Sequence, residues 1–269
     1  MIYKRHPAFT MIELIFVIVI MGILAKFGVE LIRQTYESYT RSMIVNQLEA
    51  KSEAAIQQIA NRLQYRIKDS ELANGVPLSS NTASVARLEW LGMDVDGWNA
   101  GNWSGIIDVG QSTKTTLVTP GTSSIATNDG IIFIGGGRNV LNGLWSSNIA
   151  TTQVYNVNGF ASYPGIKPSE ITIPNTGSNR YIWEFYKVID SAFMIEQVGT
   201  QLFLRSGCQP WNSGYPCNYS NNALLIDHVA TPGFSFQKLG DIIKIELCVS
   251  DNDFMGEGEY KICKHKVIF

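Results

Sequence analysis

Few residues in this sequence have types and spacings suited to catalysis. The three histidines, His6, His228 and His265, fit neither a metal-binding nor a catalytic-triad spacing. The glycine run 135–137 follows an expected strand, but it lacks the G-x-G-x-x-G pattern or G-K-[ST] ending of a phosphate-binding loop. The sequence therefore predicts no enzymatic activity and no cofactor.

Acidic side chains gather near the C-terminus, where their oxygen atoms could bind calcium. The candidate ligands are Asp251, Asp253 and Glu257, and a weaker calcium-loop fragment runs through 94–99. Neither stretch has the spacing of an EF-hand loop, and acidic groups at a hairpin tip are commonly solvated. We therefore expect no metal, and we keep calcium at Asp251, Asp253 and Glu257 as the alternative.

The four cysteines all lie in the last third of the chain, at Cys208, Cys217, Cys248 and Cys263. An even number beyond an apolar segment favours two disulfides in an oxidising compartment. Zinc is the alternative, but no C-x-x-C pair and no nearby H-x-x-x-H accompany these cysteines. Four cysteines allow three connectivities. We predict the local one, in which Cys248–Cys263 staples a C-terminal hairpin.

A single carboxylate, Glu13, lies near the start of an apolar run that covers residues 9–29. At about 1.5 Å per residue, a helix of this length spans a bilayer. An ionisable group inside a membrane segment is costly, which indicates a function and a cationic partner. Cleavage between Ala8 and Phe9 would create such a partner, the new α-amino group of Phe9. No small-x-small cleavage site follows the run, so an ordinary secretory signal peptide is not favoured.

The segment from Ala8 to Leu14 resembles the class III signal of type IV pilins and type II secretion pseudopilins. Phe9 matches the first mature residue of those proteins, and Glu13 matches the fifth. The sequence departs from the family in having Ala8 in place of the usual glycine, and Glu30 where many pilins have a proline. The resemblance implies cleavage before Phe9 by a prepilin peptidase and N-methylation of Phe9. It also implies that the apolar helices stack into a filament, where Glu13 neutralises a neighbour's amino terminus.

The elements that position these residues begin with a long helix. Residues 30–73 contain no proline, and apolar residues recur every three or four positions, which predicts an amphipathic continuation of the apolar helix. This stripe consists of Leu48, Ala55, Ile56, Ile59, Leu63 and Ile67. Asn74, Gly75 and Pro77 are expected to end the helix.

Residues 74–269 predict a β-rich globular domain, because short β-forming runs, among them 181–189 and 193–198, alternate there with turn residues. Residues 92–128 are expected to be an insertion of long loops or weak strands. The predicted fold class is α+β, with a long N-terminal α-helix packed on an antiparallel β-sheet domain that has a disulfide-stapled C-terminal hairpin. The resemblance identifies the helix as a pilin-like spine. The tryptophans Trp90, Trp98, Trp103, Trp145 and Trp211 are expected mostly in the core, and any exposed ones could stack on a sugar or contact a partner protein.

The sequence thus predicts four parts: a leader 1–8, a transmembrane and filament-core helix 9–29, a periplasmic helix 30–73 and the β-rich domain. A net charge of −2 argues against nucleic-acid binding driven by bulk charge. A basic leader holds its end of the segment in the cytoplasm, so the domain would be periplasmic on an inner-membrane anchor.

The function expected from the resemblance is that of a minor structural subunit of a type II secretion pseudopilus or a type IV pilus. Its partners would be other pilin or pseudopilin subunits, the prepilin peptidase and methyltransferase, and the inner-membrane assembly platform. The alternative is a tip adhesin, a binding module of a type IV pilus that contacts a surface, a sugar or DNA.

Overall fold

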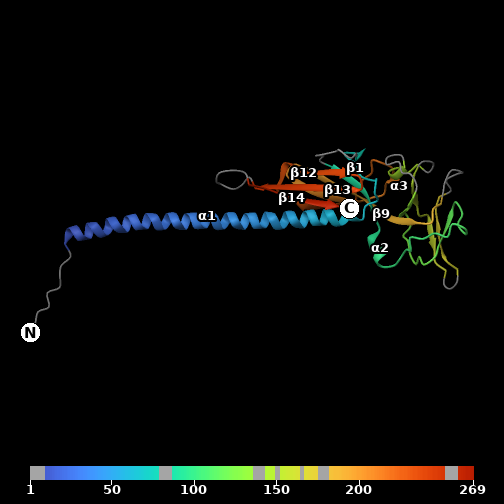
Figure 1. Cartoon of the computed structure of the whole chain (residues 1–269), viewed down its shortest axis with the longest axis horizontal. Helices are drawn as coiled ribbons and strands as arrows, with labels where there is room; N and C mark the ends of the chain where they lie inside the picture. The colour runs from blue at the N-terminus through green and yellow to red at the C-terminus, as the bar shows by residue number, and fades with distance from the viewer. Residues whose placement is uncertain are drawn as a thin grey trace, which may run out of the picture. The chain divides into compact units, whose positions relative to one another are not determined.

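The computed structural model describes residues 10–78, 87–135, 143–148, 152–163, 167–174, 182–251 and 260–269 (Figure 1). The chain forms two compact units, Met1–Ala50 and Lys51–Phe269. Ala8, Phe9, Asp253 and Glu257 lie outside the described residues, as do Gly136 and Gly137 and the side chain of Asp251. The structure therefore does not test processing at Phe9 or the calcium hypothesis.

Helix α1 runs without interruption from Met11 to Gln64, which confirms the long N-terminal helix (Figure 1). Its final turns, which belong to the second unit, bury the expected apolar stripe from Ala55 to Leu63. The helix ends earlier than residue 73, however. The physical reason is that the backbone after Gln64 forms hydrogen bonds with β3 in place of further helical ones. Ile67 N donates to Leu91 O at 2.8 Å, and Met93 N donates to Tyr65 O at 3.0 Å. Ile67 is buried although it lies beyond the helix.

The largest sheet contains eight antiparallel strands built around β9 (Tyr186–Val198). Residues 189–198 of β9 pair with β3 and β10, and residues 186–189 pair with β5. The sequence divided β9 into two strands. The other members are β1 (Leu72–Ala73), β2 (Val76–Pro77), β3 (Arg87–Met93), β5 (Gly130–Phe133), β6 (Val154–Asn156), β10 (Gln201–Cys208) and β11 (Asn221–Ile226).

The described residues also form two three-stranded antiparallel sheets, so the chain is α+β as predicted. One has the order β12–β13–β14 (Val229–Leu239, Ile242–Asp251 and Tyr260–Ile268). The other has the order β4–β8–β7 (Thr116–Thr119, Ser169–Thr172 and Gly159–Ala161). The short helices are α2 (Val95–Asn99) and α3 (Pro210–Ser213).

Both disulfides join sequence neighbours, as the local pairing predicted. Cys248 and Cys263 are direct partners in the β13–β14 register and are linked to each other. Cys208, at the end of β10, is linked to Cys217. The C-terminal hairpin is therefore closed by a disulfide as well as by backbone hydrogen bonds.

Most of the tryptophans lie in the core, as expected. Trp90, Trp103, Trp145 and Trp211 are all at most 4% exposed, whereas Trp98 is 47% exposed. The stretch 92–128 contains the short strand β4, in line with the expected loops or weak strands, and also the helix α2, which was not expected. It also contributes to one of the core clusters through Trp103, Ile107, Leu117 and Ile125.

A fully buried ion pair fixes the chain where α1 ends. Arg66 Nε donates to Glu71 Oε1 at 2.6 Å, and both side chains are 1% exposed. The same guanidinium donates to the carbonyl oxygens of Leu63 and Asp241, while Lys238 Nζ donates to Glu71 Oε2 at 2.9 Å. Since Lys238 and Asp241 lie at the β12–β13 turn, the pair joins the end of the helix to the C-terminal sheet.

Glu71→Gln should lower the free energy of unfolding by about 3 kcal/mol or more, because it leaves Arg66 as a buried cation without a counter-ion, whereas Lys238 keeps its pair with Asp69. The matched control is Asp241→Asn, which removes the exposed Lys68–Asp241 pair and should cost no more than about 1 kcal/mol. Denaturant unfolding of the full chain in detergent measures both values. Equal losses in the two variants would contradict the importance of the buried pair.

Candidate functional site

The apolar surface of the first unit is the largest candidate site. Every large apolar side chain of α1 from Met11 to Val29 is at least 44% exposed. These residues are Met11, Ile12, Leu14, Ile15, Phe16, Val17, Ile18, Val19, Ile20, Met21, Ile23, Leu24, Phe27 and Val29. An apolar surface of this extent normally faces a membrane or another protein. The helix is long and apolar enough to cross a membrane.

Glu13 is the one charged residue between Met11 and Ala25. Its Oε2 accepts a hydrogen bond from Thr10 Oγ1 at 3.5 Å, at the start of the helix. Within the described part of the chain, no cation forms an ion pair with this carboxylate.

The weak calcium-loop fragment 94–99 forms a helix cap. Asp94 Oδ1 accepts from Gly97 N at 2.8 Å, and Asp94 Oδ2 accepts from Trp103 Nε1 at 3.1 Å. Because both oxygens are engaged inside the protein, Asp94 serves to start α2 and to hold Trp103.

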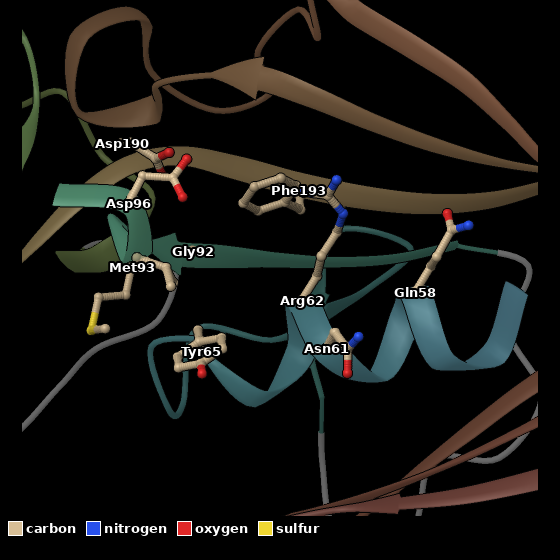
Figure 2. Close-up of a pocket in the computed structure, with 10 residues that line it drawn as sticks. Gln58, Asn61, Arg62, Tyr65, Gly92, Met93, Asp96, Asp190 and Phe193 are labelled. Atoms are coloured by element: carbon tan, nitrogen blue, oxygen red, sulfur yellow. The ribbon is translucent and has the colours of Figure 1, made fainter. Parts of the chain in front are cut away.

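A polar pocket of about 350 Å³ opens in the second unit between the end of α1, β3, α2 and β9 (Figure 2). Figure 2 shows Asp96 and Asp190 on one side, and Arg62 and Gln58 on the other. The guanidinium of Arg62 lies 5.3 Å from the ring centroid of Phe193. The remaining lining residues are Asn61, Tyr65, Gly92, Met93 and Val95. A volume of this size is within the usual range for small-ligand pockets.

The carboxyl groups of Asp129 and Asp190 are harder to ionise than usual. Burial, reinforced by the negative charge of Asp94, raises the pKa of Asp129 to about 6 and that of Asp190 to about 7. The residue Asp190 is exposed overall, so water partly screens the effects that raise the pKa of its carboxyl group. The three side chains come from different segments, at the end of β3, before β5 and within β9.

A second, apolar pocket of about 510 Å³ surrounds the exposed Trp98. Trp98 lies against Trp103 with ring centroids 4.7 Å apart, and Ile106, Ile134 and Phe185 line the same space. These last three are also at least 38% exposed. Four large apolar residues thus share one exposed groove, the aromatic groove.

The sequence had not indicated either pocket, because each is built from segments far apart in the chain. One signal was available for the polar pocket. The expected strands 181–189 and 193–198 were separated at Asp190, where a charge interrupts a β-forming run. The structure shows that the strand continues there and carries Asp190 at the pocket.

Comparison of the chain with protein-family models, characterised proteins and solved structures finds no match. The functional argument therefore depends on the residues and their surroundings.

Raising the pH from 5 to 8 should remove stability that Asp129 and Asp190 contribute. Their pKa values are raised in the folded protein. This contribution is therefore fully present below the unfolded value of about 4 and is lost as the pH passes about 6 and about 7. Asp190→Asn should thus raise the melting temperature, relative to the wild type, more at pH 8 than at pH 5.

Thermal unfolding across this pH range measures the difference, with Glu184→Gln as a control at another exposed acidic residue. If the difference in melting temperature between the wild type and Asp190→Asn does not change with pH, the raised pKa of Asp190 is contradicted.

Proposed function

We propose that this chain is a membrane-anchored structural subunit, a minor pilin or minor pseudopilin of a type IV pilus or a type II secretion pseudopilus. The observation that carries the proposal is the exposed apolar part of α1, Met11–Val29, with one carboxylate, Glu13, near its start. A bilayer covers such a surface before assembly, and the apolar helices of neighbouring subunits cover it afterwards.

The charge on Glu13 supports assembly over simple anchoring. A helix that served only as a membrane anchor would have no use for a carboxylate inside the bilayer, because burying an ionised group there costs free energy. Cleavage before Phe9 supplies an ammonium group, and the resemblance to pilins implies that a neighbour's ammonium pairs with the glutamate. Helix-on-helix packing then provides the adhesion, and the charge pair selects the axial register.

The disulfides and the leader agree on the orientation. The basic leader stays in the cytoplasm, and disulfides form in an oxidising compartment such as the periplasm. We therefore place the second unit in the periplasm on an inner-membrane anchor. The prepilin peptidase and methyltransferase, the assembly platform and other pilin-like subunits are its proposed partners.

The mature protein should begin at an N-methylated Phe9. Mass spectrometry of the N-terminal peptide from the purified membrane protein measures this directly. Deletion of the host's prepilin peptidase is the control and should restore the full leader. Detection of intact Met1 in the wild-type host, or a cut beyond residue 29, would refute the proposed processing.

Glu13→Ala should leave membrane insertion unchanged but lower incorporation into the filament about tenfold or more, since an ammonium group loses its charged partner. Glu30→Ala is the matched control, because Glu30 lies on the same helix beyond the apolar run and bonds to Arg33 and Gln34. Immunoblots of sheared filaments and membranes give the ratio. Equal incorporation of the two variants would count against the charge pair.

A binding module at the filament tip is the second candidate, and the aromatic groove favours it. Trp98→Ala should weaken binding to the recognised surface or sugar by about tenfold, because exposed tryptophans commonly dominate such contacts. Leu224→Ala, at an exposed residue outside the groove, is the control. Glycan-array and cell-adhesion measurements in which both variants bind like the wild type would remove this candidate.

A further inference from the structure

The polar pocket in Figure 2 carries opposite charges at its two ends. Asp96 comes from α2 and Asp190 from β9, whereas Arg62 comes from the final turn of α1. In the described part of the chain, none of these three side chains forms an ion pair. Arg62 instead lies over the ring of Phe193, which holds its guanidinium in place by a cation–π contact.

Further negative charge lies near the acidic end of the pocket. Asp94 and Asp129 lie close enough to Asp190 to act on its charge. Asp94 is already engaged by Gly97 and Trp103. The negative potential at this end therefore favours a cation that enters from solvent and contacts Asp96 and Asp190.

Apolar side chains form part of the pocket walls. In Figure 2 the ring of Phe193 lies between the two carboxylates and the guanidinium of Arg62, and Met93 and Val95 also line the pocket. Such walls suit a short chain of methylene groups. The order of surfaces is thus anionic, apolar and cationic, which matches a basic amino-acid residue from its side-chain end to its carbonyl end.

We propose that this pocket binds arginine or lysine, with the guanidinium or ammonium at Asp96 and Asp190 and the carbonyl or carboxylate at Arg62. The residue could arrive as a free amino acid or as part of another protein, since the same chemistry recognises both. The proposal goes beyond the filament function and does not depend on it.

Ligand-observed NMR titrations of the full chain in detergent test the proposal directly. L-arginine and L-lysine should bind, and L-citrulline, which replaces the guanidinium with a neutral group of similar shape, should bind about tenfold or more weakly. N-acetyl-L-arginine amide distinguishes the sources. Binding equal to that of arginine supports a protein side chain as the ligand, and binding of free arginine alone supports an amino acid.

The variant Asp96→Asn/Asp190→Asn should weaken arginine binding about tenfold or more, because both anionic contacts become neutral. Glu184→Gln, an exposed acidic residue outside the pocket, is the matched control, and melting curves report whether each variant folds. The citrulline comparison uses the wild type and so holds even if the double variant is unstable. Absence of arginine and lysine binding, equal binding of citrulline, or full binding by a folded double variant would overturn the proposal.

Discussion

The exposed apolar part of α1, Met11–Val29, is the strongest physical constraint on the molecule, because exposure of apolar surface to water is unfavourable. Its large side chains from Met11 to Val29 are all exposed. At roughly 25 cal/mol for each Å² of apolar surface, leaving this segment in water would cost far more than a domain's usual stability. Such a surface normally faces a membrane or another protein. In the proposed function, Glu13, the one charge the segment contains before Lys26, finds its cation there.

The same helix serves a different purpose at its other end. There it turns amphipathic, buries Ala55, Ile59 and Leu63, and stops where Ile67 pairs with β3. The Arg66–Glu71 pair then ties that stop to the C-terminal sheet. One continuous helix thus combines an exposed apolar surface at its start with a buried structural element at its end.

Local patterns predicted the parts of the fold that depend on neighbouring residues. The apolar run and the amphipathic pattern that follows it predicted α1, and the short spacings between cysteines predicted both disulfides. Long-range pairing explains the failures. The helix end depends on β3, which sequence patterns did not reveal, and the polar pocket joins Arg62, Asp96 and Asp190 across more than a hundred residues. Whether Phe9 becomes the first residue of the mature protein is a chemical event that no fold displays.

In the proposed function, the apolar segment contacts other subunits after it leaves the bilayer. Photo-crosslinking from a benzoylphenylalanine placed at Phe16, in cells that assemble filaments, detects such contacts. We expect crosslinks to a pilin-like subunit that appear only when the prepilin peptidase is active. They should disappear when Glu13 is replaced by alanine. Crosslinks to lipid alone, or the same protein crosslinks without the peptidase, would contradict the proposed function.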